Sequence, residues 1–217
     1  MATTYYGQAH QDKYVLNVLK EKRNGYFLEI GSNDPVFINN TYLLESQYDW
    51  RGIMVEYCPR FLQSYKEKRP NSTHVIQNAI TIDYKKLLED NNAPTNIDYL
   101  QIDLEVENGS TIDALIKMDN EIFDKYKFAT ITFEHDNYCD NYLDVRGRSR
   151  EIFAKRGYYR VFDDIYNNSP ELVYEDWYVH PDLVDMKYIL ELQQKNATRY
   201  EPCNRTGRSL GWFNIIY

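Results

Sequence analysis

The chain has 217 residues, 43% of them hydrophobic, which suits one folded domain with a real core and excludes a disordered or fibrous protein. Its formal net charge of -8 repels phosphate backbones, so we expect no nucleic-acid partner. No apolar run approaches the ~18 residues needed to cross a bilayer. The N-terminal stretch "MATTYYGQAHQDK" also lacks the apolar core of a secretion signal. We expect a cytoplasmic protein without a membrane span, with residues 1–217 as one domain or as a piece of a larger polypeptide.

Short apolar runs alternate with amphipathic stretches along the whole chain. In chain order they predict a helix at 11–22, a strand at 25–30, a helix at 40–48, a strand at 52–57, a helix at 59–68, a strand at 73–80, a helix at 84–90, a strand at 97–105, a helix at 111–118, a strand at 128–135, a helix near 142–156 and strands at 157–165 and 171–179. Such alternation is typical of an α/β protein with a mostly parallel sheet and helices on both faces. The connection "YNNSP" is too short for a parallel crossover, so the last two strands are expected to form an antiparallel pair at one edge. This is the Rossmann-like architecture of class I methyltransferases.

Polar side chains stand where each of the five expected parallel strands ends. In doubly wound sheets, ligands bind beyond the carboxyl ends of the strands, so these side chains should share one rim. They are Glu29, Gly31, Ser32, Asn33 and Asp34 after the first strand, Glu56 after the second, Asn78 after the third, Asp103 and Glu105 after the fourth, and Glu134, His135 and Asp136 after the fifth.

The stretch "YFLEIGSND" limits the kind of cofactor that this rim can hold. A dinucleotide site favours GxGxxG, whereas only Gly31 is present and Asp34 would repel a pyrophosphate. A cationic cofactor without phosphate, such as S-adenosylmethionine, fits better. Glu56 follows Gly31 by about 25 residues, a position that suits a carboxylate binding ribose hydroxyls. A nicotinamide-dependent oxidoreductase and a non-catalytic binding module on the same fold remain alternatives.

Six stretches taken together resemble the FkbM-type methyltransferases over about residues 7–184. These stretches are "GQAHQDKYVL", "GYFLEIGSNDP", "NNTYLLE", "WRGIMVEY", "IDYLQIDLE" and "ITFEHDNY". The chain departs from the family at Pro35 and Val106, where the family usually has glycine. The resemblance implies a class I fold and methyl transfer from S-adenosylmethionine to oxygen, often to a hydroxyl of a sugar or polyketide.

The same resemblance implies roles for the residues of the rim. Glu29 and residues 31–34 would form the loop on the methionine side of the cofactor, and Asp103 would lie near its sulfonium and amino group. Glu56 would bind the ribose. The adenine would be bordered by Asn78 and Ala79.

Methyl transfer to a hydroxyl needs a group that takes the hydroxyl proton. His135 is the expected base, and the carboxylates of Asp103, Glu105 and Glu134 could orient it or act as the base. Those carboxylates could instead bind Mg²⁺ or Mn²⁺, which prefer oxygen ligands. A structural hydrogen bond remains the alternative role of His135, and an ion pair to Arg148 or Arg150 that of Glu134.

The stretch "YEDWYVHP" at 174–181 gathers aromatic residues after the last strand. It could cover a small-molecule or glycan acceptor, with Trp177 and Tyr178 stacked on a sugar. It could equally be a strand with Trp177 in the core. Gln8, Gln11 and Asp12 could close the opposite side of the site, or cap and face the first helix.

Overall fold

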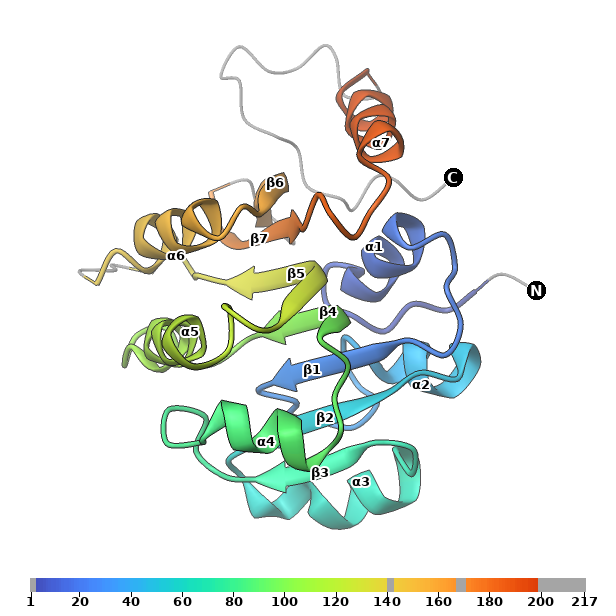
Figure 1. Cartoon of the computed structure of the whole chain (residues 1–217), viewed down its shortest axis with the longest axis vertical. Coiled ribbons are helices and arrows are strands. Elements are labelled where there is room, and N and C mark those ends of the chain that lie inside the picture. The colour runs from blue at the N-terminus through green and yellow to red at the C-terminus, as the bar shows by residue number, and fades with distance from the viewer. Residues whose placement is uncertain (1–2, 140–142, 167–170, 199–217) are drawn as a thin grey trace.

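A computed structural model describes residues 3–139, 143–166 and 171–198. Seven strands form one sheet in the order β3-β2-β1-β4-β5-β7-β6 (Figure 1). The first five are parallel, and β7 runs antiparallel to both of its neighbours. Their bounds are β1 Tyr26–Ile30, β2 Arg51–Glu56, β3 Thr73–Ile76, β4 Asn96–Ile102, β5 Lys127–Glu134, β6 Tyr159–Tyr166 and β7 Val173–Val179. This topology confirms the predicted fold class and the antiparallel pair at one edge.

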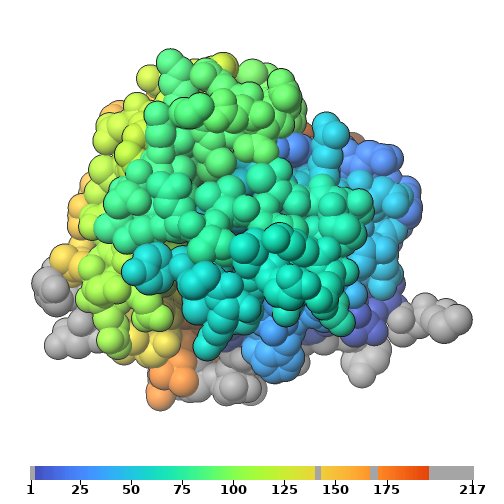
Figure 2. All heavy atoms as spheres, turned by 90° about the horizontal axis from the view of Figure 1, so that it is seen from below, coloured from blue at the N-terminus to red at the C-terminus, as the bar shows by residue number. Residues whose placement is uncertain are grey.

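Helices cover both faces of this sheet. Side chains of α4, α5 and α6 pack in the apolar core on one face, and those of α1, α2, α3 and α7 pack on the other. Residues 60–95, coloured cyan to green, make up most of the surface seen from the β3 side (Figure 2). The helices are α1 Gln11–Val18, α2 Tyr42–Tyr48, the 3₁₀ turn η1 Pro59–Phe61, α3 Leu62–Lys68, α4 Tyr84–Asp90, α5 Ser110–Glu121, α6 Val145–Lys155 and α7 Met186–Thr198.

The inner strand β5 shows why the sheet is buried on both faces. Its six residues from Phe128 to Phe133 are all buried, because helices lie above and below them. Continuous apolar runs of this kind are typical of parallel strands that face helices on both sides. No helix in the described part of the chain combines the length and the apolar character needed to cross a membrane.

Two element boundaries differ from the predicted ones in ways that matter for the site. The first helix ends at Val18, since Lys20 and Glu21 adopt left-handed backbone conformations with φ of 53° and 55°. The fourth strand ends at Ile102, so Asp103 and Glu105 lie just beyond it. A further helix, α7, occupies the region beyond residue 185, where the sequence pattern is weak.

Candidate functional site

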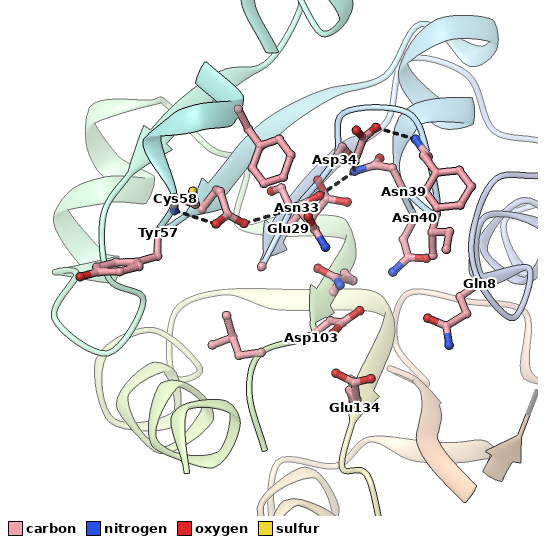
Figure 3. Close-up of a pocket in the computed structure, with 18 of the residues that line it drawn as sticks. Gln8, Glu29, Asn33, Asp34, Asn39, Asn40, Tyr57, Cys58, Asp103 and Glu134 are labelled. Atoms are coloured by element: carbon pink, nitrogen blue, oxygen red, sulfur yellow. Dashed lines mark hydrogen bonds between the residues drawn. The ribbon is translucent and has the colours of Figure 1, made fainter. Parts of the chain in front are cut away.

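A cavity of about 660 Å³ lies beyond the carboxyl ends of β1, β2, β4 and β5 (Figure 3). Most of the residues predicted for the rim line it, together with side chains from the loop before α1 and the loop after β1. The lining residues are Gln8, Glu29, Gly31, Ser32, Asn33, Asp34, Phe37, Ile38, Asn39, Asn40, Glu56, Tyr57, Cys58, Arg60, Phe61, Gln101, Asp103, Leu104, Glu105, Glu134 and Asp136. Seven of these side chains are carboxylates, and Arg60 is the one Arg or Lys among them, so the cavity suits a cation.

The turn after β1 requires glycine. Gly31 has a φ of 85°, and a Cβ atom built on it would lie 1.8 Å from the carbonyl oxygen of Asp103. Any larger residue would therefore clash with the backbone that follows β4, in addition to straining its own backbone. The N–H groups of Gly31 and Ser32 both donate to the carbonyl of Val55, at 2.9 and 3.1 Å. The turn thus holds the ends of β1, β2 and β4 together at the cavity.

Asp34 builds the loop that follows this turn. Its Oδ1 accepts hydrogen bonds from the N–H groups of Val36 and Phe37, at 2.9 and 2.7 Å. Asn39 closes the loop, because its Nδ2 donates to the carbonyls of Ser32 and Asp34. The carboxylate of Asp34 therefore shapes the cavity wall, and Pro35 is accommodated where the resembled family usually has glycine.

Glu56 is the carboxylate expected to bind a ribose. Its Oε2 accepts from the N–H of Asn33 at 2.9 Å, and its Oε1 accepts from the N–H of Cys58 at 2.7 Å. Each carboxylate oxygen has a second lone pair, so these bonds fix the side chain and still leave acceptor capacity for two hydroxyl groups. Glu56 joins the loops after β1 and β2 on the cavity wall.

A buried arginine, which sequence analysis missed, organises the loop from outside the cavity. The guanidinium of Arg69 is 0% exposed and pairs with Glu45, with 2.8 Å between Nε and Oε2. It also donates to Asn39 Oδ1 at 2.9 Å and to Thr41 Oγ1 at 2.6 Å. Thr41 in turn donates to Oε1 of Glu29 at 3.0 Å. The loop between β1 and α2 is thereby tied to the end of α3.

Glu29 faces the cavity from inside the sheet and is only 1% exposed. Its second oxygen, Oε2, has no hydrogen-bond partner among the described residues. Burial raises the pKa of Glu29 to about 7, although the nearby Arg69 acts in the opposite direction. An unpartnered buried carboxylate oxygen calls for a donor from a ligand.

Carboxyl groups form a row on this face of the sheet. The register pairs Ile102 with Phe133 and Glu134 with Glu175, so Asp103, Glu134 and Glu175 follow one another across β4, β5 and β7. Burial and the neighbouring Asp103 carboxylate raise the pKa of Glu134 well above its ordinary range, because like charges at this spacing oppose ionisation. Asp103 and Glu134 lie close together on the same side of the cavity in Figure 3.

Glu175 is the member of this row that sequence analysis did not select. Its Oε2 accepts from Gln11 Nε2 at 2.9 Å and from Trp177 Nε1 at 2.7 Å. Burial raises the pKa of Glu175 to about 8. Gln101, another unselected residue, lies beside Glu29 in the register of β1 and β4, and its Oε1 is buried without a hydrogen-bond partner among the described residues. The sequence signal that could have identified Gln101 is a single amide within the apolar run "YLQI".

The structure does not bring His135 to the cavity. Its side chain is 0% exposed and lies behind the rim, with Nε2 3.4 Å from Oδ1 of Asp176. Arg150 Nε donates to the same Asp176 at 2.6 Å. Burial opposes the ionised form of Asp176, but Arg150 and His135 outweigh it and hold its pKa well below the usual range. His135 therefore belongs to a buried ion-pair network.

A divalent metal at the cavity is not supported by the grouping of possible ligands. Among the described residues, one trio of potential ligands gathers within 4.8 Å, namely His135, Asp164 and Asp176. Arg150 Nη2 already donates to Asp164 and Asp176, at 2.9 Å each, so a guanidinium neutralises the position that a cation would take. This pairing also shows that Arg150 is not the ion-pair partner of Glu134.

The remaining predicted residues line one of two cavities or are buried. Asn78 and Ala79 line a second cavity of about 230 Å³, which shares Tyr57, Leu104 and Glu105 with the first. Gln8 lines the first cavity, whereas Gln11 and Asp12 are buried and hydrogen-bonded. Trp177 and Tyr178 are buried in β7, which agrees with the alternative of a strand with Trp177 in the core and not with a platform for a sugar.

Comparison with known proteins places this geometry in a fold class. No family model and no curated protein matches the chain. Among solved structures, a candidate rRNA methylase from Clostridium thermocellum matches with a TM-score of 0.54 at 10% identity, over 82% of this chain and 99% of that one. The amino pentose methyltransferase CalS10 from Micromonospora echinaspora gives 0.54 at 8%, over 80% and 89%. The MTase domain of delta-N METTL16 gives 0.53 at 10%, over 80% and 82%. The chain thus has the class I, Rossmann-like methyltransferase fold.

Proposed function

We propose that this protein is an S-adenosylmethionine-dependent O-methyltransferase that acts on a hydroxyl of a sugar or glycan. The observation that carries the proposal is the acidic cavity at the Gly31 turn, with Glu29 Oε2 and Gln101 Oε1 buried and unpartnered among the described residues. Hydrogen-bond acceptors in an acidic cavity fit the ammonium and sulfonium of this cofactor. The similarity to methyltransferase structures supports the same class. The proposal treats residues 1–217 as one methyltransferase domain.

The two connected cavities suggest how the chain would hold this cofactor. Glu56 would accept the ribose hydroxyls with its remaining lone pairs, and Glu29 would accept from the ammonium group. The smaller cavity at Asn78 and Ala79 would take the adenine. When bound, S-adenosylmethionine supplies a methyl group on a sulfonium, so attack by oxygen forms the O–CH₃ bond, breaks the S–CH₃ bond and leaves a neutral thioether.

The proton of the acceptor hydroxyl needs a base on the other side of the cavity. Asp103 and Glu134 lie side by side there and line the cavity, whereas His135 does not. One of the two carboxylates, in its ionised form, would take the proton. Glu105 lines both cavities and would lie beside the adenosine of the cofactor.

The charges of the cavity bear on the acceptor class. The cavity is lined by seven carboxylates and by one arginine, Arg60, so it would repel the phosphates of a nucleic acid. This charge supports a small molecule or a glycan as the acceptor. The cavity would also repel the pyrophosphate of a nicotinamide dinucleotide. A thermal-shift comparison of NAD with S-adenosylmethionine separates the two classes of cofactor.

The test of the cofactor site is equilibrium binding of S-adenosylhomocysteine, measured by calorimetry. We expect binding to the wild type and a loss of at least about tenfold in Glu56→Ala, because the ribose loses charge-assisted hydrogen bonds. The exposed Glu67→Gln on α3 is the matched control and should bind like the wild type. No binding to the wild type, or equal binding by Glu56→Ala, would refute the assignment. Transfer of labelled methyl to a panel of monosaccharides, with and without chelator, tests the acceptor class and the metal requirement.

A further inference from the structure

Four carboxylates at the ends of β4 and β5 lack a cationic partner. These are Asp103, Glu105, Glu134 and Asp136, and none of them forms an ion pair within the described residues. The acids across the cavity differ, since Asp34 and Glu56 are each held by two backbone N–H groups. The four carboxylates therefore concentrate negative charge on one side of a shared space.

A buried amide on the same cavity lacks a partner as well. Oδ1 of Asn40 has no hydrogen-bond partner among the described residues, although Asn40 is only 4% exposed. Asn40 lines the cavity and lies with Gln8 on the side of the opening that faces Glu134 in Figure 3. Glu29 and Gln101 are assigned above to the cofactor, so we assign Asn40, the third unpartnered acceptor that lines this cavity, to a second ligand. A buried polar atom without a partner costs free energy until a donor reaches it.

The proposed cofactor does not carry enough positive charge to neutralise the four carboxylates at the ends of β4 and β5. S-adenosylmethionine carries a sulfonium, an ammonium and a carboxylate, which leave it a net single positive charge. Glu29 is near Arg69, but the four carboxylates of β4 and β5 have no comparable partner. Burial and the Asp103 carboxylate raise the pKa of Asp136 to about 6, which shows how poorly this side tolerates its own charge. A second cationic group would relieve that repulsion.

A metal ion is the less suitable source of this charge. Divalent ions need several ligand atoms converging on one point. In the described parts of the chain, the oxygens of these four carboxylates do not form a group within 4.8 Å, and the trio that does includes none of them. A protonated amine has three N–H donors, which two carboxylates and one amide oxygen can satisfy, so it does not need a group of three carboxylates.

We propose that the acceptor carries a protonated amine, which Glu134 and Asp136 bind by charge-assisted hydrogen bonds with Asn40 as a further acceptor. The inference rests on the proposed function and narrows its substrate class from sugars to amino sugars. The amine serves recognition, and a neighbouring hydroxyl of the same molecule receives the methyl group, which leaves Asp103 as the base that takes the hydroxyl proton. Neutral sugars and N-acylated amino sugars would bind more weakly, because they lack the charge.

The experiment compares D-glucosamine with D-glucose and N-acetyl-D-glucosamine, which differ in the charge at one position. Binding of each is measured at pH 7 to the protein saturated with S-adenosylhomocysteine. We expect D-glucosamine to bind at least about tenfold more tightly than the other two. Glu134→Gln and Asp136→Asn, alone and combined, should remove this preference. Asp182→Asn, an exposed acid that pairs with Lys127, is the control and should keep the preference.

The outcomes separate the two proposals. If S-adenosylhomocysteine binds and the three sugars bind alike, or none binds detectably, this inference is overturned while the cofactor assignment stands. A preference that survives the combined variant also overturns it. If added Mg²⁺ strengthens binding of all three sugars equally and EDTA reverses the effect, a metal takes the place assigned to the amine. Failure of S-adenosylhomocysteine to bind counts against the proposed function itself.

Discussion

The two walls of the cavity are built from the same residue types in different ways. On the β1 wall, formed by Glu29, Asp34 and Glu56, backbone N–H groups donate to Asp34 and Glu56, and the hydroxyl of Thr41 donates to Glu29. On the β5 wall, formed by Asp103, Glu105, Glu134 and Asp136, no described residue forms an ion pair with them. The protein's own donors hold most of the first wall in place and leave Glu29 Oε2 for a ligand, whereas the second wall holds charge that a ligand would neutralise. The contrast separates acids that build the fold from acids available for chemistry.

Removing the cation of the β1 wall should have the largest effect. Arg69→Met leaves Glu45 buried without its partner and removes the bonds to Asn39 and Thr41. Breaking a buried ion pair from one side costs about 3–5 kcal/mol, so we expect a loss of that order in the free energy of unfolding, measured with urea. Arg23→Met removes an ion pair whose two side chains are more than half exposed and should cost less than about 1 kcal/mol. Equal losses in the two variants would contradict the distinction.

The acid row continues behind the β5 wall at Glu175 and should make stability depend on pH. Its pKa of about 8 in the folded protein exceeds its ordinary value of 4.5, so the folded state keeps a proton that the unfolded chain loses. The free energy of unfolding should therefore fall as the pH rises from 4.5 to 8. Glutamine cannot ionise, so Glu175→Gln should abolish this part of the fall. Between pH 4.5 and pH 7 the variant should therefore lose about 3 kcal/mol less of its free energy of unfolding than the wild type.

Urea unfolding at pH 5, 6, 7 and 8 tests this expectation. Glu67→Gln changes an exposed carboxylate on α3 and serves as the control, with a pH profile parallel to that of the wild type. A parallel profile for Glu175→Gln as well would show that this carboxyl group ionises freely in the folded protein.

The sequence predicts the sheet and the rim, because apolar runs mark strands and polar residues end them. It does not predict which acids become neighbours. Asp103 and Glu134 meet because Ile102 pairs with Phe133, and register of this kind is set by tertiary packing. His135 was selected for its chemistry, although successive residues of a strand point to opposite faces. Glu134 lines the cavity, so its neighbour faces away from it.

Arg69 illustrates what sequence patterns conceal. In "KEKRP" it resembles one more charge at the end of an exposed helix. Its burial depends on the loop at 35–41, which folds over it and supplies three of its partners. Those contacts join residues about thirty positions apart, beyond the range of local periodicity.

The smallest expected effect separates stability from binding on the β1 wall. Tyr65→Phe removes the hydrogen bond from the Tyr65 hydroxyl to the carbonyl of Asn33, in the loop proposed to hold the cofactor. Tyr14→Phe removes an equivalent bond to the carbonyl of Tyr178, away from the cavity. Each should lower the free energy of unfolding by about 1 kcal/mol, the usual net value of such a bond.

Only Tyr65→Phe should also weaken binding of S-adenosylhomocysteine, by a few-fold, because the free loop gains conformations that binding must then remove. Urea unfolding and calorimetry on the same two proteins measure both quantities. Equal affinities in the two variants, with equal losses of stability, would mean that Asn33 is held by Glu56 alone, since Glu56 Oε2 accepts from the Asn33 N–H. In that case the carboxylates alone would hold the loop of the β1 wall in place before the cofactor binds, and Tyr65 would contribute only to packing.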